Sequence, residues 1–169
     1  MHESAMTGLA YFRDKYMNPA QITKILDVGS LDVNGTFRDI LQVPNWLYHG
    51  ADIGEGKNVD IILEDPHNWV DLKDESYDVV ISGNTFEHIS YPWLTIKEIA
   101  RVLRKGGYLC LIAPFICPEH YFPRDCWRFL PDGMTALSDW AELEVVEVLN
   151  SNDRTAVVVD TMLIARKPL

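Results

Sequence analysis

The segment 24–38, KILDVGSLDVNGTFR, constrains the fold more than any other part of the chain. A short apolar run ends in an acid, Asp27, and Gly29 lies two residues further on. Glycine at such a point lets a strand stop abruptly, so that the backbone can approach a bound ligand. Asn34 and Gly35 then begin a helix-like segment. Near the start of a chain that alternates strands and helices, this pattern predicts a nucleotide-type ligand at the carboxyl end of the first strand.

Apolar periodicity and turn residues predict the other elements. Strands are expected over 24–28, 46–53, 59–63, 77–82, 108–113, 143–149 and 155–166, and helical segments over 7–17, 37–41, 92–103 and 131–141. The segment 65–75 is too polar for a long helix, and Ser151, Asn152 and Asp153 are expected to form a turn between the last two strands. We therefore expect one α/β domain over residues 1–169. It has a Rossmann-like, mostly parallel seven-stranded sheet, helices on both faces and a C-terminal antiparallel hairpin.

Composition narrows the classes of partner. The 169 residues carry a net charge of -10 and a pI near 4.8, a field that repels nucleic acid and anionic membrane surfaces. No apolar run is long enough to span a bilayer, and no signal peptide is evident. Three cysteines, an odd number, argue against a secreted disulfide framework. We therefore expect a cytoplasmic protein with no nucleic-acid or membrane partner.

Asp52 ends the second predicted strand, 25 positions after Asp27. An acid at this place can accept two hydrogen bonds from ribose hydroxyls. In dinucleotide-binding folds such an acid follows the glycine turn by about 20 residues. The turn is not G-x-G-x-x-G, because Leu31 and Asp32 occupy its middle. Asp32 disfavours a pyrophosphate but suits a ligand that carries an ammonium and a sulfonium. Together with the closing hairpin, this favours S-adenosylmethionine over a nicotinamide cofactor.

Four stretches carry a resemblance to the class I S-adenosylmethionine-dependent methyltransferases, in particular the methyltransferase type 11 group. They are ILDVGSLDVNG, YHGADI, YDVVISGNTFEHI and IARVLRKGGYLCLIAPF. The resemblance implies that Asp52, with Ile53 beside it, holds the ribose. It places the other cofactor contacts at Asp27, Gly29 and Ser30 for the methionine part, Asp65 and Pro66 for the adenine, and Gly83 and Asn84 for the methyl side. Leu31 replaces the second glycine that such enzymes usually have in the first turn.

The catalytic candidates follow the fourth and fifth strands. His88 lies near the edge of the sheet where reacting atoms sit, although a packing role for Glu87 and His88 is the commoner one. In the stretch HYFPRDCWRFLPDG, His120 could act as a general base, Arg124 and Arg128 could clamp an acidic group, and aromatic side chains could stack on a sugar. The same stretch could instead be a lid in which Asp125 pairs with an arginine.

The arrangement H-x-x-P-x-D-x-W-R-F is similar to one in methyltransferases encoded near glycan-biosynthesis genes. We therefore expect methyl transfer from S-adenosylmethionine to a small acceptor, a hydroxyl of a sugar or glycan precursor. Two alternatives stay open: a non-catalytic S-adenosylmethionine-binding interaction module and a nicotinamide-dependent oxidoreductase.

Two further expectations concern metals and assembly. The spacing of Cys117, His120 and Cys126 fits no standard zinc pattern, so no metal is expected. Aromatic residues near the N-terminus, among them Tyr11 and Phe12, could form a lid or the contact of a homodimer.

Overall fold

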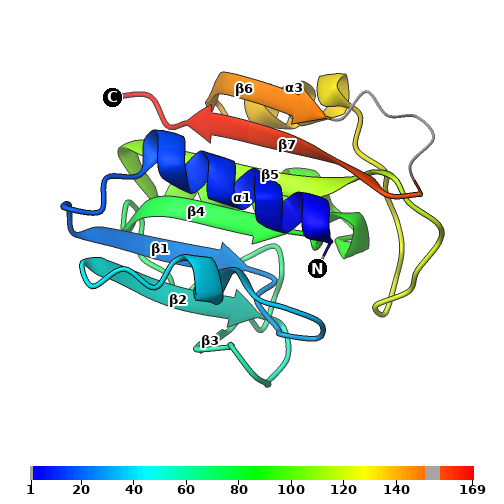
Figure 1. Cartoon of the computed structure of the whole chain (residues 1–169), viewed down its shortest axis with the longest axis horizontal. Helices are drawn as coiled ribbons and strands as arrows, with labels where there is room; N and C mark the ends of the chain where they lie inside the picture. The colour runs from blue at the N-terminus through cyan, green and yellow to red at the C-terminus, as the bar shows by residue number, and fades with distance from the viewer. Residues whose placement is uncertain (1, 151–156) are drawn as a thin grey trace.

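Seven strands form one mixed sheet in the order β3-β2-β1-β4-β5-β7-β6, in a computed structural model that describes residues 2–150 and 157–169 (Figure 1). The strands are β1 (Thr23–Val28), β2 (Trp46–Asp52), β3 (Ile61–Ile62), β4 (Tyr77–Gly83), β5 (Leu103–Ile116), β6 (Glu144–Asn150) and β7 (Val159–Arg166). The first five are parallel, and β7 runs antiparallel to both β5 and β6. The predicted fold class is confirmed, while the turn at 151–153 lies outside the described residues.

Helices cover both faces of this sheet. They are the α-helices α1 (Glu3–Tyr16), α2 (Pro92–Val102) and α3 (Pro131–Trp140), and the 3₁₀ turns η1 (Phe37–Ile40) and η2 (Phe86–His88). One apolar core joins α1 and η1 to one face of the sheet, through Phe12 and Phe37, and a second core joins α2 and α3 to the other. Every helix in the described part of the chain is too short or too polar to cross a lipid bilayer.

The predicted helix at 37–41 is wrong in kind, because η1 is a short 3₁₀ turn. The Thr36 hydroxyl accepts from the Arg38 amide (3.1 Å), and the Leu41 amide donates to the Arg38 carbonyl (3.1 Å), a spacing of three residues. Pro44 follows closely and cannot continue a helix. The connection from β1 to β2 is therefore nearly all loop.

The fifth strand begins earlier than predicted, at Leu103. Leu103 pairs with Tyr77 of β4, and the glycine pair that was expected to break the chain lies inside the strand at a shift in its register. Gly106 has φ +75°, a left-handed conformation that glycine adopts without strain. The expected chain break is a bulge within β5.

The segment 65–75 forms turns with no helix, as its polarity predicted. The Arg101 guanidinium on α2 donates to the carbonyls of Trp69 (2.8 Å) and Leu72 (2.7 Å), and the Trp69 side chain is buried. One arginine and one tryptophan thus hold a connection that lacks secondary structure of its own.

The aromatic residues of α1 belong mainly to the core and do not form a lid. Phe12 is fully buried and stacks on Tyr16, with 5.6 Å between ring centroids. Tyr11 is more exposed, and its hydroxyl donates to Glu147 of β6 (2.9 Å). A homodimer through this helix stays a prediction, with less exposed aromatic surface than the sequence pattern indicated.

Candidate active site

A cavity of about 710 Å³ opens at the carboxyl ends of the parallel strands. The strand order reverses between β1 and β4, and open α/β sheets bind ligands in the crevice at such a point. The cavity is lined from the turn after β1, past the ends of β2 and β4, to residues 120–124 of the loop after β5. Its volume lies within the ~300–1,000 Å³ range of small-molecule sites.

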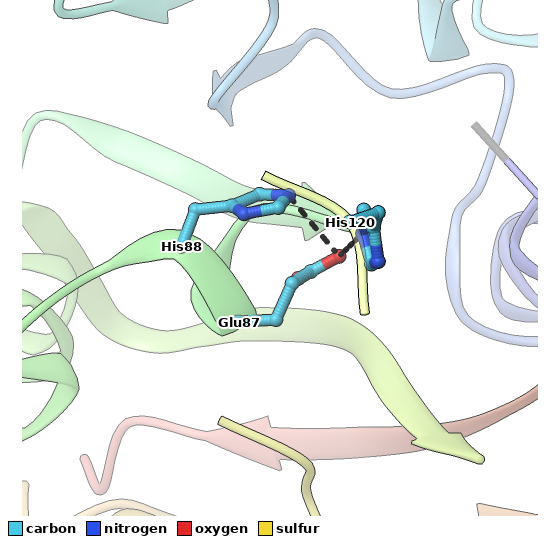
Figure 2. A group of neighbouring side chains, drawn as sticks. All are labelled: Glu87, His88 and His120. Carbon is cyan, nitrogen blue, oxygen red and sulfur yellow. Dashed lines mark ion pairs between the residues drawn. The ribbon is translucent and has the colours of Figure 1, made fainter. Parts of the chain in front are cut away.

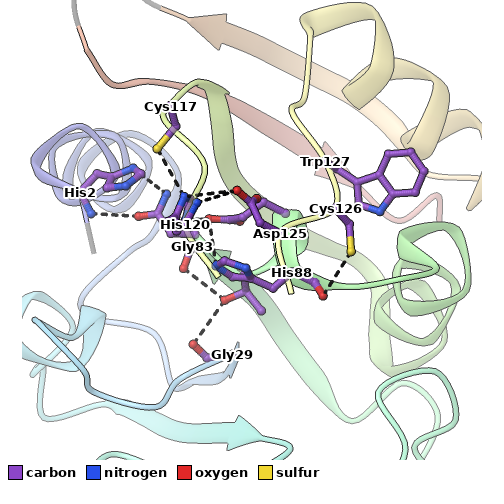
Figure 3. A network of polar contacts seen from close by, with 12 residues as sticks. His2, Gly29, Gly83, His88, Cys117, His120, Asp125, Cys126 and Trp127 are labelled. Atoms are coloured by element: carbon purple, nitrogen blue, oxygen red, sulfur yellow. Dashed lines mark hydrogen bonds and ion pairs between the residues drawn. The ribbon is translucent and has the colours of Figure 1, made fainter. Parts of the chain in front are cut away.

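Two glycines allow the close approach of backbone on the cavity floor. A Cβ atom at Gly29, where φ is +80°, would lie 2.1 Å from Oγ1 of Thr85, and one at Gly83 would lie 2.3 Å from Cζ of Phe37. The Thr85 hydroxyl lies 3.4 Å from the Gly29 carbonyl and 3.2 Å from that of Gly83 (Figure 3). The glycine after β1 is therefore required by the packing of the turn against the segment after β4.

Asp52 lines the cavity at the end of β2. Its carboxylate accepts from the amides of Leu31 (3.0 Å) and Gly54 (3.3 Å). A carboxylate offers about four acceptor positions, so roughly two remain for a ligand. Ile53 beside it is exposed and lines the same part of the cavity. The residues present therefore fit a ligand that offers a pair of hydroxyls next to an apolar ring.

Asp27 and Ser30 do not line this cavity. The Tyr48 hydroxyl donates to the Asp27 carboxylate, and burial raises the pKa of that carboxyl to about 7 although the hydrogen bond from Tyr48 opposes the shift. The Ser30 hydroxyl donates to the Asn58 carbonyl (3.1 Å), and the Asn58 amide donates back to the Ser30 carbonyl (2.8 Å). Both predicted cofactor residues thus support the turn from behind.

Asp32 is also outside the cavity lining, which weakens one argument made from the sequence. Its carboxylate pairs with the Lys57 ammonium and accepts from the Gly35 amide (2.9 Å). The hydrogen bond from Lys57 lowers the pKa of Asp32. Because Lys57 balances its charge, Asp32 does not discriminate between a sulfonium ligand and a pyrophosphate.

Of the two residues predicted to contact the adenine, only one lines the cavity. Pro66 lines the cavity beside Leu63 and Trp69, whereas Asp65 lies outside the lining and accepts from the His67 amide (2.8 Å). The acid fixes the turn that places Pro66 at the cavity wall.

Asn84 joins the cavity to the start of α1. Its side-chain oxygen accepts from the His2 amide (2.9 Å), and its amide donates to Asp160 of β7 (3.1 Å). The His2 ring lies 3.0 Å from the same Asp160 oxygen, and both His2 and Asn84 line the cavity. The N-terminal end of α1 therefore forms part of the cavity wall.

Glu87, His88 and His120 meet at the other end of the cavity (Figure 2). The Nε2 atoms of both histidines lie 3.7 Å from Oε1 of Glu87. The Glu87 side chain is fully buried, and neither carboxylate oxygen has a hydrogen-bond partner among the described residues. Burial raises the pKa of Glu87 to about 8 and lowers the pKa of His88. Both histidines line the cavity, while Glu87 lies behind them.

Arg128 does not reach the cavity, unlike the two predicted catalytic histidines. Its guanidinium pairs with both carboxylate oxygens of Asp125 (2.6 and 2.8 Å) and donates to the carbonyls of Cys117 (3.1 Å) and Pro118 (3.0 Å). Asp125 also accepts from the His120 amide (2.8 Å; Figure 3). The arginine thus shapes the loop that carries His120, and the aspartate–arginine pair expected for a lid is present.

Of the other side chains of this loop, some line the cavity and Trp127 contacts the protein instead. Trp127 donates from its indole to the Ile89 carbonyl (2.9 Å), so it ties the loop to the segment after η2. Tyr121, Phe122 and Arg124 line the cavity, and Tyr121 is 69% exposed. The aromatic residues that could meet an acceptor are therefore Tyr121 and Phe122.

Sequence reasoning weighed Glu87 and His88 as a pair and missed their approach to His120. The available signal was topological, because the fourth and fifth strands belong to a sheet predicted to be mostly parallel, and the carboxyl ends of parallel strands meet at one sheet edge. His88 follows β4, and His120 follows β5.

Comparisons with known proteins agree with this geometry. A family model described as a methyltransferase domain matches residues 31–111, just under half of the chain. A Burkholderia thailandensis 1,6-didemethyltoxoflavin-N1-methyltransferase, solved with S-adenosylhomocysteine, is 14% identical over 99% of this chain and 80% of its own, with a TM-score of 0.75. A Haemonchus contortus phosphoethanolamine N-methyltransferase 2, solved with S-adenosyl-L-methionine, is 14% identical over 96% of this chain and 52% of its own (TM-score 0.72). No curated protein sequence matches the chain.

The cyclase SpnF has the same fold, at 16% identity over 88% of this chain and 76% of its own, with a TM-score of 0.69. A fold therefore does not decide the reaction by itself. The family match is specific to methyltransferase domains and spans the segment from the turn after β1 into β5. The family match over residues 31–111 and the shared fold agree with the resemblance to the class I S-adenosylmethionine-dependent methyltransferases, and two of the similar structures were solved with S-adenosylhomocysteine or S-adenosyl-L-methionine.

Proposed function

We propose that this enzyme methylates a hydroxyl of a sugar or glycan precursor. The observation that carries the proposal is one continuous cavity that has a diol-compatible carboxylate, Asp52, at one end and two histidines, His88 and His120, at the other. The cofactor would occupy the Asp52 end, and the acceptor the histidine end.

The cofactor part of the proposal assigns a role to each lining residue. The free acceptor positions of Asp52 take the ribose hydroxyls, and Ile53 and Pro66 bound the adenine. The backbone at Gly29 and the segment Gly83–Asn84 face the methionine part and its methyl group. Three residues outside the lining support these contacts indirectly: Asp27, Ser30 and Asp65.

The acceptor part depends on the rim formed by the loop after β5. Tyr121 and Phe122 present aromatic surface at the cavity, which suits the apolar face of a sugar ring. Arg124 lines the cavity beside them, with its guanidinium on the Ser90 hydroxyl (3.0 Å), and can meet an acidic group of a sugar precursor. A neutral polyol also suits this rim, because its ring can stack on the aromatic side chains and its hydroxyls can form hydrogen bonds.

The reaction needs positioning more than covalent help. The acceptor oxygen forms a bond to the methyl carbon as the carbon–sulfur bond breaks, and the charged sulfonium becomes a neutral thioether. The acceptor hydroxyl loses its proton in the process. His88 and His120 at the cavity wall, with Glu87 behind them, can promote this loss, either by proton transfer to an imidazole or through a bound ion.

Calorimetric titration with S-adenosylhomocysteine tests the cofactor assignment. We expect Asp52→Ala to weaken binding roughly ten- to 100-fold, because hydrogen bonds to a charged group contribute about 1.5–3 kcal/mol. Asp71→Ala, which removes an exposed acid outside the cavity lining, should leave affinity unchanged. No binding to the wild type, or equal affinity for Asp52→Ala, would contradict the assignment.

The acceptor class is tested with methyl-labelled S-adenosylmethionine and panels of sugars, nucleotide sugars, small amines and small acids. Label transfer confined to the sugar panels supports the proposal. Transfer confined to amines would overturn the acceptor class while leaving the cofactor assignment intact.

A further inference from the structure

The buried carboxylate of Glu87 lacks the partners that such a group needs. Its side chain has 0% exposure, and both oxygens are without a hydrogen bond among the described residues. Leaving a buried polar group unsatisfied costs about 1–3 kcal/mol, and more for a charge. Glu87 lies on η2 directly behind two cavity-lining histidines, so a ligand bound between them could satisfy it.

The histidines direct unprotonated nitrogens at this carboxylate. The His88 Nδ1 atom bonds to the Arg124 carbonyl, and the His120 Nδ1 atom lies 3.1 Å from the Pro118 carbonyl. A carbonyl only accepts, so Nδ1 carries the proton in each ring and Nε2 of the neutral imidazole has a lone pair. Both Nε2 atoms face Oε1 of Glu87 at 3.7 Å.

This distance is too long for a direct hydrogen bond, but it is close to the separation of atoms that bind one metal ion. Hydrogen bonds from nitrogen to oxygen span about 2.7–3.2 Å. Ligand atoms that each lie ~2.1 Å from one metal ion are separated by roughly 3–3.5 Å. Here the three ligand atoms lie within 4.8 Å of one another. A small closing movement of the His120 loop would bring them to coordinating distances.

The surroundings match those of metal ligands. Carbonyl oxygens that hold the second nitrogen of a ligating histidine fix its tautomer and orientation. The loop that carries His120 is fastened to Glu87 itself, whose carbonyl accepts from the amides of Cys126 (2.7 Å) and Trp127 (3.1 Å). The pair of Asp125 and Arg128 shapes the same loop and anchors the His120 amide. The geometry of the cluster is thus built by contacts outside it.

We propose that Oε1 of Glu87, Nε2 of His88 and Nε2 of His120 bind one divalent transition-metal ion. Two imidazoles and a carboxylate suit Mn²⁺, Fe²⁺ or Zn²⁺ and leave coordination positions open. Because both histidines line the cavity and Glu87 lies behind them, the open positions face the acceptor end. This assignment differs from the sequence expectation of no metal and uses neither cysteine that was considered there.

The metal's part in catalysis rests on the proposed function, whereas its binding does not. An acceptor hydroxyl on the ion would have a lower pKa and would lose its proton to solvent. The oxygen would then form its bond to the methyl carbon as the carbon–sulfur bond breaks. The products are a methyl ether, S-adenosylhomocysteine and one proton, with no change in oxidation state.

The test uses the full chain after chelator treatment. Zn²⁺ and Mn²⁺ are titrated by calorimetry, and Co²⁺ by visible absorption, which reports nitrogen and oxygen ligands. We expect one ion per chain. Changes of second-layer residues cost 10–100-fold in metal affinity, so Glu87→Gln and His120→Asn should each weaken binding by at least about 100-fold.

Two matched variants control for other ligands. His49→Asn removes a histidine whose ring contacts Tyr77 far from the cluster, and Cys117→Ser removes a thiol 3.6 Å from Nδ1 of His120. Both should bind metal like the wild type. Absence of stoichiometric binding, unchanged binding in Glu87→Gln, or loss of binding in Cys117→Ser would each overturn the site.

Titration with S-adenosylhomocysteine separates failure of the site from failure of the fold or of the proposed function. Glu87→Gln and His120→Asn should bind this ligand as the wild type does. Metal binding by a wild type that does not bind S-adenosylhomocysteine would sustain the metal site and refute the proposed function. Full methyl transfer by chelated enzyme would refute the metal's catalytic role.

Discussion

Two buried carboxylates, Asp27 and Glu87, lie near the ends of neighbouring strands and differ in their partners. Asp27 is on β1, which pairs with β4, and Glu87 follows β4 by a few residues. Burial raises the pKa of both groups, to about 7 and about 8. Asp27 accepts a hydrogen bond from Tyr48, whereas Glu87 has no such partner among the described residues. The free-energy cost of burying a carboxylate is therefore offset by a hydrogen bond at Asp27 and is not offset in this way at Glu87.

The difference separates a structural carboxylate from a candidate ligand. Asp27 belongs to a closed network in which the Tyr48 hydroxyl also accepts from the Asn58 amide (3.1 Å), and Asn58 in turn holds Ser30. Glu87 faces two imidazole lone pairs across 3.7 Å. The first arrangement is complete without a ligand, and the second gains its missing partner from a cation.

The largest expected effect concerns Asp27 and pH. The folded pKa is about 7 and the ordinary value 3.8, so the folded chain retains a proton that the unfolded chain releases as pH rises between them. The free energy of unfolding should therefore fall across this window, by up to about 4 kcal/mol at ~1.4 kcal/mol per pKa unit. Asp27→Asn should remove this contribution. Urea unfolding near pH 5 and pH 8 measures the part of this fall above pH 5, which should be about 3 kcal/mol.

The exposed Asp14 provides the control, since Asp14→Asn should keep the wild-type pH dependence. An unchanged slope in Asp27→Asn would show that burial does not raise the pKa of Asp27 as inferred.

Tyr48→Phe should have the next largest effect. It removes the hydroxyl that donates to Asp27 and leaves a buried carboxylate unsatisfied, a loss of about 1–3 kcal/mol in the free energy of unfolding. The effect should be larger near pH 8, where Asp27 is ionised, than near pH 5. Tyr11→Phe, on the surface of α1, should change stability by less than about 0.5 kcal/mol. Equal losses in the two variants would remove the distinction drawn for Asp27.

Local signals were sufficient for the sheet and for part of the cavity. Gly29 was predicted because glycine lets a strand stop abruptly and its backbone approach a ligand, and Asp52 because an acid at the end of the second strand can accept hydrogen bonds from ribose hydroxyls. Gly29 has left-handed backbone, and both residues line the cavity. The antiparallel pairing of the last two strands was predicted from the turn residues 151–153 between two β-rich runs, and β6 and β7 do pair antiparallel. These features depend on short stretches of chain, which the sequence displays directly.

The direction in which a side chain points could not be predicted from these local sequence patterns. Whether Asp27 points into the cavity depends on Tyr48, a residue of another strand, and Arg128 is withdrawn by its bidentate pair with Asp125. The meeting of Glu87 with His120 joins segments that only the pairing of β4 with β5 brings together. Such contacts are set by the packed structure, and spacing along the chain does not encode them.

Glu87→Gln should have only a small effect on stability, and its diagnostic value is the sharpest. The change conserves shape and breaks no hydrogen bond described for the folded chain, so the free energy of unfolding should stay within about 1 kcal/mol of the wild type. Metal affinity should nevertheless collapse in this variant. Tyr48→Phe should show the converse, a loss of stability with metal affinity retained. Chemical unfolding and metal titration on both variants make the comparison, and a Glu87→Gln protein destabilised as much as Tyr48→Phe would identify Glu87 as a second structural carboxylate.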